Sequence, residues 1–286
     1  MTMTSFLSRI LSPDKRGRFG GAASPHRLIV FAHAVGGIGA TTLAVNTAYA
    51  FNPAKVARAS CLIDLDIQYG RAARLLDMAA TSGMELLVEN QRALESSLFD
   101  RVLTAHGSGL QLLTAPRQPM PLTLLKRATL TALLQSCIAR FPVVTVDLPV
   151  ALTTWTDVVL KAASRIYLVT PVSVPAAHAA RCFLTLLEQH GLDRLPVRIV
   201  AARRQTADKK HAIAPEKFCD AIGRSIDKVV HDDFDLIQRS HNEGIPAIEL
   251  APRSRFARTI AELVNDAVRA DVPEQKAPAV DPLKAW

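Results

Sequence analysis

The chain has few cysteines, few aromatic side chains and no long apolar run, and each shortage excludes a class of protein. Its four cysteines stand far apart, and no two of them form a CxxC pair. Such spacing is unlike a disulfide framework or a zinc site, so we interpret the thiols as reduced core residues of a cytoplasmic protein. They are Cys61, Cys137, Cys182 and Cys219.

No apolar run approaches the roughly 20 residues that a membrane-spanning helix needs, and residues 1–21 lack the apolar core and cleavage site of a secretory signal. Aromatic residues make up only 5 % of the 286 residues, which disfavours a surface that stacks single-stranded bases. Positive charge is in excess: the formal net charge is +8. This excess indicates an anionic partner, or serves solubility alone.

The most informative absence is that of a lysine in a glycine-rich stretch near the N-terminus. Residues 29–34 form an apolar run typical of a strand, residues 36–39 are rich in glycine, and residues 43–51 have a helical pattern. Strand, glycine-rich loop and helix in this order form a P-loop, whose backbone N–H groups and helix N-terminus hold phosphate. Val35 and Ala40 stand where a lysine is expected, so we expect binding of ATP or ADP with Mg²⁺ to be weak or lost. The predicted nucleotide-binding residues are Gly36, Gly37, Ile38, Gly39, Ala40, Thr41 and Thr42.

Apolar runs alternate with helical patterns from residue 28 onward, and the runs are continuous, as in strands buried on both faces of a parallel sheet. We therefore predict an α/β fold with a doubly wound, mostly parallel sheet flanked by helices. This domain would span residues 28–270, between a flexible leader at 1–27 and a disordered tail at 271–286. The expected strands are 28–34, 61–65, 110–113, 143–148, 166–170 and 197–201, with one more near 226–230. The expected helices are 42–51, 85–92, 123–140, 154–163, 175–190 and 254–269, and helical patterns prevail beyond residue 210.

Three aspartates follow or end the expected strands, where an open α/β sheet binds its ligand. Thr41 could offer its hydroxyl to Mg²⁺, and Asp147 or Asp64 could hold that ion through water. Asp66 is the candidate for orienting an attacking water. Each aspartate alone could instead be a helix cap at a strand end. Their order after a glycine-rich loop favours the nucleotide site.

Basic residues gather at two further places, and each has two interpretations. The cluster from Arg198 to His211 is either a solvated loop or a docking patch for an acidic partner or lipid head groups. The leader carries Phe6, Leu7, Ile10 and Leu11 on one helical face ahead of Lys15 and Arg16. It is either a loose tail or a short segment that lies on an anionic membrane surface.

Several stretches resemble the ParA/MinD superfamily, and more narrowly its CpaE/TadZ branch of Flp/Tad pilus assembly proteins. The loop from Gly36 to Asn46 resembles the deviant Walker A motif of that branch. The stretch Asp64–Gly70 resembles its DLDLQFG motif, and Val146–Pro149 followed by Trp155 resembles VDLP…WT. The stretch Asn242–Ser254 resembles NQGRPLVELAPRS. The resemblance covers residues 28–268, but it departs from the superfamily at the signature lysine, which is Val35 here.

The resemblance implies a cytoplasmic organiser of the Tad (Flp) pilus machinery, at the inner membrane or the cell pole. Its implied partners are the secretion ATPase and inner-membrane components, with a second copy of the chain in a homodimer. The leader at 1–27 is too short for the receiver-like domain that CpaE-like proteins usually carry. The alternative is a ParA/MinD-type positioning ATPase acting on DNA or membrane, which the positive charge would suit but the absent lysines count against. Nucleic acid is the less favoured partner because aromatic residues for base stacking are few. A nitrogenase-reductase-like enzyme would need cysteine ligands in loops, and the cysteines lie in apolar segments.

Overall fold

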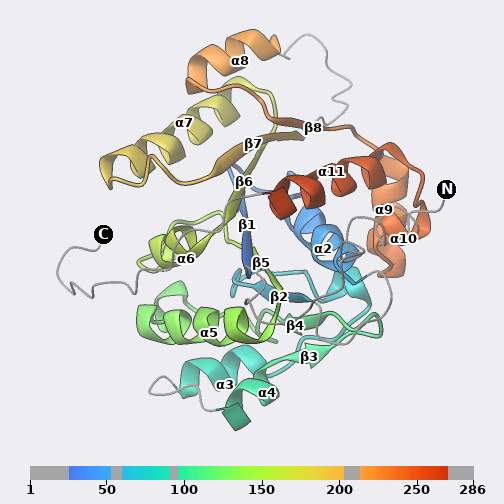
Figure 1. The fold of residues 1–286 in the computed structure, drawn as a ribbon. Helices are drawn as coiled ribbons and strands as arrows, with labels where there is room; N and C mark the ends of the chain where they lie inside the picture. Colours follow the sequence, from blue (N-terminus) through green and yellow to red (C-terminus); the bar gives the residue numbers. More distant parts are fainter. Residues whose placement is uncertain (1–25, 53–59, 91–95, 203–212, 270–286) are drawn as a thin grey trace, which may run out of the picture.

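The apolar runs of the chain pair into one sheet (Figure 1) in a computed structural model that describes residues 26–52, 60–90, 96–202 and 213–269. The described strands are ordered β3-β4-β2-β5-β1-β6-β7-β8, and every neighbouring pair is parallel except β3 with β4. The predicted fold class is confirmed. The strands are β1 (Arg27–His33), β2 (Ser60–Asp64), β3 (Thr104–Ala105), β4 (Gln111–Leu113), β5 (Val143–Asp147), β6 (Arg165–Thr170), β7 (Val197–Ala202) and β8 (Lys228–Val230).

The helices cover the sheet in two layers, which lie to its left and right in Figure 1. Each layer buries its apolar side chains against one face, so the central strands carry apolar residues on both sides. The first layer contains α3 (Gly83–Glu89), α4 (Ser96–Val102), α5 (Arg127–Arg140), α6 (Thr156–Ala162), α7 (Val174–Gln189) and α8 (Pro215–Ile222). The second contains α2 (Ala40–Ala50), α9 (Phe234–Glu243), α10 (Ala247–Leu250) and α11 (Arg255–Arg269), with the short turn η1 (Arg74–Leu76).

Three elements differ from the sequence-based expectation. The helix expected at 123–140 begins at Arg127, after a separate turn η2 (Leu122–Leu124), because Leu125 and Lys126 are extended. Leu125 is 1 % exposed, and this extended link lets its side chain enter the core. The sequence analysis also missed α4 and the two-residue strand β3, both too short for a periodic pattern to register.

The cysteines follow the expectation only in part. Cys61 and Cys137 are buried, Cys219 is intermediate, and Cys182 is exposed on α7, so the prediction of core residues is wrong for Cys182. Among the described residues, no helix is both long and apolar enough to cross a membrane.

The two ends of the chain and most of the basic cluster lie outside the described residues. These are the leader up to residue 25, the tail from 270, and the basic residues Arg203, Arg204, Lys209, Lys210 and His211. Arg198 is described, and it makes ion pairs with Asp227 at 3.3 Å and Asp266 at 3.8 Å.

Candidate nucleotide-binding site

The glycine-rich loop links β1 to α2 and leaves a row of backbone amides without acceptors. Gly37 (φ 72°) and Gly39 (φ 89°) adopt the left-handed conformation that glycine tolerates best, and open space surrounds both. Leu43 donates the first helical bond, to the Gly39 carbonyl at 3.0 Å. No amide of residues 35–42 donates a hydrogen bond to another described residue, and no side chain caps α2. Such free N–H groups at a helix N-terminus can hold a phosphate.

Asp147 ends β5 beside this loop, and only one of its two carboxylate oxygens has a hydrogen-bond partner among the described residues. Oδ1 lies 3.1 Å from Nε2 of His33, the last residue of β1. Oδ2 is buried without a hydrogen-bond partner among the described residues, and the whole residue is 1 % exposed. A buried carboxylate oxygen that lacks a donor is costly unless a ligand or water satisfies it. The sequence analysis placed His33 at a strand end but did not connect it with Asp147.

Asp64 ends β2 directly across from Asp147 in the strand register. Both of its oxygens already accept backbone hydrogen bonds, from the amide of Asp66 at 3.2 Å and from that of Ala72 at 3.1 Å. Burial, and then the neighbouring Asp147 carboxylate, raise the pKa of Asp64 well above its usual range. Gly70 makes this arrangement possible, because a Cβ there would collide with the Asp64 carboxylate. The structure therefore brings Asp64 and Asp147 together and ties Asp64 to its own loop.

Asp66 and Thr41 are less constrained by protein contacts. Asp66 Oδ1 accepts from the amides of Gln68 at 3.3 Å and Tyr69 at 3.0 Å, which makes a turn after β2. Thr41 is half-buried at the start of α2, and its hydroxyl makes no hydrogen bond to another described residue. The roles of Asp66 with water and of Thr41 with Mg²⁺ stay predictions.

A second group of contacts clamps the start of α2 to the C-terminal part of the chain. Thr42 Oγ1 lies 3.0 Å from His241 Nε2 on α9, and Asn46 Oδ1 accepts from the Ile248 amide of α10 at 3.1 Å. Burial, and then the positive charge of Arg71, lower the pKa of His241. Arg71 thus acts electrostatically on His241, which contacts Thr42 of the predicted site. The sequence analysis missed this role of Arg71 and the contact of His241. Since Thr42 and His241 are 199 residues apart, no local pattern could signal their contact.

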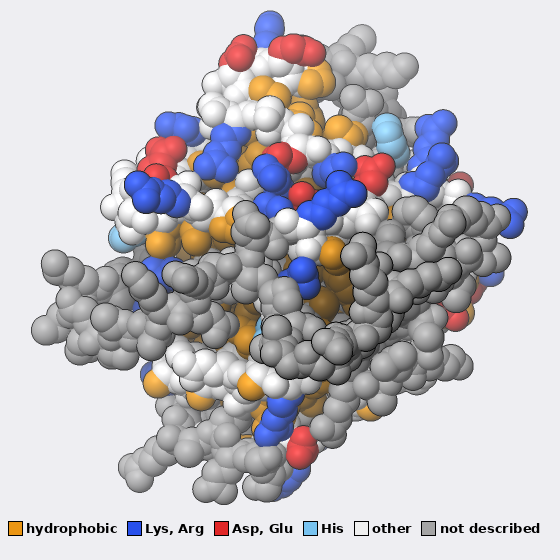
Figure 2. Space-filling model, in the orientation of Figure 1, with side chains coloured by type: hydrophobic (Ala, Val, Ile, Leu, Met, Phe, Trp, Pro, Cys, Tyr) orange, Lys and Arg blue, Asp and Glu red, His pale blue; other side chains and the backbone are white. Residues whose placement is uncertain are grey.

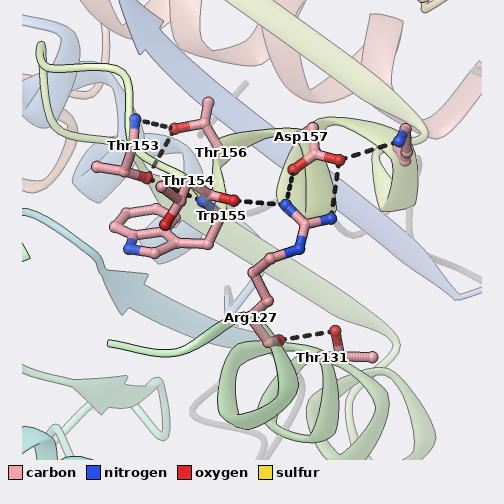
Figure 3. Close-up of polar contacts among 8 residues, drawn as sticks. Arg127, Thr131, Thr153, Thr154, Trp155, Thr156 and Asp157 are labelled. Carbon is pink, nitrogen blue, oxygen red and sulfur yellow. Dashed lines mark hydrogen bonds and ion pairs between the residues drawn. The ribbon is translucent and has the colours of Figure 1, made fainter. Parts of the chain in front are cut away.

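The loop after Asp147 lies against the glycine-rich loop. A Cβ at Gly36 would be 3.9 Å from Val150 Cγ2, which is ordinary van der Waals contact. Further along, Thr153 donates its amide to Thr156 Oγ1 at 2.9 Å (Figure 3). The fully buried Trp155 donates Nε1–H to the Leu122 carbonyl at 3.3 Å. These contacts hold the far end of the loop in place.

An ion pair anchors the same loop to α5. Arg127, in the first turn of α5, forms a bidentate pair with Asp157 of α6 and also donates to the Thr154 carbonyl (Figure 3). Lys161 adds a third cationic contact to Asp157 at 2.9 Å. Burial opposes ionisation of Asp157, but the bonds from Arg127 and Lys161 outweigh it and lower the pKa of this carboxyl group. The network fixes the start of α6 relative to α5.

Large apolar side chains are exposed in the loops and at the first helical residues that follow the carboxyl ends of the strands. Tyr69 follows β2, Val150 and Leu152 follow β5, Val174 follows β6, and Phe234 follows β8. Their exposed fractions range from 45 % for Val150 to 72 % for Tyr69. Where such residues adjoin one another, they mark a surface that another molecule covers.

Solved structures with a similar fold include several ATPases of the ParA, MinD and McdA kinds. A ParA family ATPase from Chlorobium tepidum TLS superposes with a TM-score of 0.74 at 21 % identity, covering 87 % of this chain and 100 % of its own. The fold is that of the ParA/MinD ATPases. The septum site-determining protein MinD from Pyrococcus horikoshii OT3, complexed with Mg-ADP, has a TM-score of 0.66 at 18 % identity, over 84 % of this chain and 95 % of its own. The ATP complex of a Cyanothece McdA variant has a TM-score of 0.64 at 18 % identity, over 87 % of this chain and 98 % of its own. No protein-family model matches the chain, and no curated protein sequence matches it.

Proposed function

We propose that this chain is a positioning protein of the ParA/MinD kind that binds ATP or ADP weakly and hydrolyses ATP little or not at all. One observation carries the proposal: the loop keeps its unpaired amides next to an Asp147 oxygen that lacks a donor, yet has no lysine. The amides and the start of α2 suit phosphate. Val35 and Ala40 supply no charge to a transferring phosphoryl group. Loss of one such charge commonly lowers a rate by about 10²–10³-fold.

The described residues also fit a magnesium ion in part. The free Thr41 hydroxyl and the unpaired Asp147 oxygen are the ligand types that Mg²⁺ accepts, directly or through water. When bound, the ion would neutralise phosphate charge. Asp64 contributes less, because backbone amides already occupy both of its oxygens.

The more specific role that we propose is organisation of the Tad (Flp) pilus machinery as a homodimer. Stretches that resemble CpaE/TadZ proteins contact one another: Asn46 Oδ1 accepts from the Ile248 amide, and Asp64 lies across from Asp147 in the strand register. The exposed apolar residues at the carboxyl edge would suit a second copy of the chain. The secretion ATPase, inner-membrane components and an anionic membrane surface are the proposed partners.

Positioning on DNA or membrane is the second candidate function. The structural neighbours include a MinC:MinD cell division complex from Aquifex aeolicus and a putative plasmid partition protein from Borrelia burgdorferi B31 bound to AMPPNP. Copurification with and without ATP distinguishes the candidates. Recovery of a secretion ATPase supports the pilus role, and recovery of a DNA-partition partner supports the alternative.

The nucleotide proposal is tested by measuring ATP binding and turnover in the parent chain and in Val35→Lys. We expect weak binding and almost no turnover in the parent, and tighter binding in the variant because a cation joins the amide row. Ala221→Lys is the matched control, since this exposed alanine lies in the last turn of α8 and outside the proposed site and dimer surface. Steady turnover by the parent that Asp66→Ala abolishes would contradict the proposal.

A further inference from the structure

Three arginines at the start of α11 form a concentrated positive surface, here called the α11 arginine patch. Arg253 precedes the helix, and Arg255 and Arg258 lie in its first turn, three residues apart and so on one face. All three are exposed, and no ion pair or hydrogen bond joins their guanidinium groups to another described residue. Figure 2 shows blue side chains across the middle and at the upper right, the side on which Figure 1 shows α11 beginning.

The cations at the other end of α11 are different. Arg165 pairs with Asp266 at 2.9 Å, and Lys228 pairs with Glu262 at 3.1 Å. Asp266 lies in the last turn of α11, where the negative end of the helix dipole also favours cations, whereas Glu262 lies in the middle of the helix. The protein therefore neutralises its positive charge at one end of α11 and leaves it uncompensated at the other.

The position of the α11 arginine patch is electrostatically unfavourable within the isolated protein. The first turn of α11 contains no acidic residue, so three positive charges face the positive end of the helix dipole. Capping is supplied instead by Ser254, whose Oγ accepts from the Ala257 amide at 3.0 Å. The arginines thus bring no stabilising contact to the fold, and an external anion would relieve their mutual repulsion.

The surroundings of the patch identify the kind of anion. Phe256 and Ala257, between the arginines, are 3 % and 1 % exposed, so the patch offers no aromatic ring for a base and no apolar anchor for a bilayer. Glu262 lies one turn beyond Arg258 and limits the positive surface to a short stretch of the helix. The planar fork of arginine suits paired contacts with carboxylates.

We propose that the α11 arginine patch binds a short acidic segment of a partner protein, whose Asp and Glu carboxylates pair with the three guanidinium groups. This inference goes beyond the proposed function, since the patch is separate from the glycine-rich loop and needs no nucleotide. Electrostatic complementarity of this kind sets partner choice and speeds association.

The test measures binding of a fluorescein-labelled peptide of alternating Glu and Ser to the full chain by fluorescence anisotropy. Replacing Arg253, Arg255 and Arg258 by Ala should weaken binding about 10-fold or more. Raising the ionic strength to about 0.5 M should weaken binding to the parent and have little effect on the variant, because salt screens exposed charges. The variant should melt no lower than the parent, since the three replaced guanidinium groups make no hydrogen bond or ion pair to another described residue.

A matched control removes the same charge elsewhere by replacing Arg101, Arg194 and Lys217 by Ala, three exposed cations on α4, the α7–β7 loop and α8. This control should keep nearly the full affinity for the peptide. Equal losses in the two triple variants, or no peptide binding by the parent, would overturn the proposal. Tighter binding through the α11 arginine patch to a random-sequence DNA duplex or to phosphatidylglycerol vesicles would also overturn it, because the partner would then be a phosphate surface.

Discussion

Gly70→Ala tests how the aspartate pair beneath the glycine-rich loop is held. A Cβ at residue 70 would lie 2.6 Å from the Ala115 Cβ and closer still to both carboxylate oxygens of Asp64. Asp64 is fully buried and cannot turn toward solvent, since its oxygens accept from the amides of Asp66 and Ala72. The added methyl group must therefore displace the carboxylate, break these hydrogen bonds, or shift the backbone after β2.

The expected loss of unfolding free energy combines two costs. Inserting a methyl group into a packed core costs about 1–3 kcal/mol. Weakening hydrogen bonds to a buried carboxylate costs about 1.5–3 kcal/mol. Together these give roughly 3–5 kcal/mol, or a melting temperature lowered by about 6–20 °C for a domain of this size.

Urea unfolding monitored by circular dichroism measures this loss, with Gly107→Ala as the matched control. No heavy atom lies within 4 Å of a Cβ built at Gly107, so the control should change stability by no more than about 0.5 kcal/mol. Both substitutions lower the conformational entropy of the unfolded chain by a similar amount, so this contribution to the unfolding free energy cancels when the two variants are compared. The reasoning is refuted if the unfolding free energies of Gly70→Ala and Gly107→Ala differ by less than about 1 kcal/mol. In that case Gly70 would not be packed closely against the Asp64 carboxylate.

Two further predictions concern charges around the site. Arg127→Met leaves the buried Asp157 with only one cationic partner, so we expect a loss of about 2 kcal/mol in urea unfolding at neutral pH, discounted for the partial exposure of Arg127. Because the folded-state pKa of Asp157 is lowered, the stabilisation exists above the ordinary value of 3.8 and disappears as the pH falls through the folded value; a loss equally large in acid would contradict the ion-pair account. Arg71→Ala should raise the pKa of His241, because removing the nearby positive charge favours the imidazolium. An NMR titration of the His241 ring measures this shift, and an unchanged pKa would show that burial alone sets it.

The strands other than β3, and their order of appearance, were predictable because each is a short apolar run. Buried parallel strands such as β2 and β5 contain almost nothing but apolar residues before their terminal aspartates, and this pattern is local. The break between η2 and α5 was not predictable, because residues 123–140 keep a helical periodicity throughout and only core packing of Leu125 makes the chain extended there. The exposure of Cys182 likewise depends on which face of α7 meets the sheet.

For the candidate site, the sequence by itself determined the chemistry available: a glycine-rich loop before a helix, no lysine at Val35 or Ala40, and aspartates at the strand ends. Only the tertiary structure decided how these groups are used. It pairs His33 with Asp147 across 114 residues and leaves one Asp147 oxygen without a donor. It also turns Asp64 toward its own loop. The physical reason is that hydrogen bonds and burial depend on which chain segments meet in space, and residues so far apart along the chain leave no periodic signal of their contact.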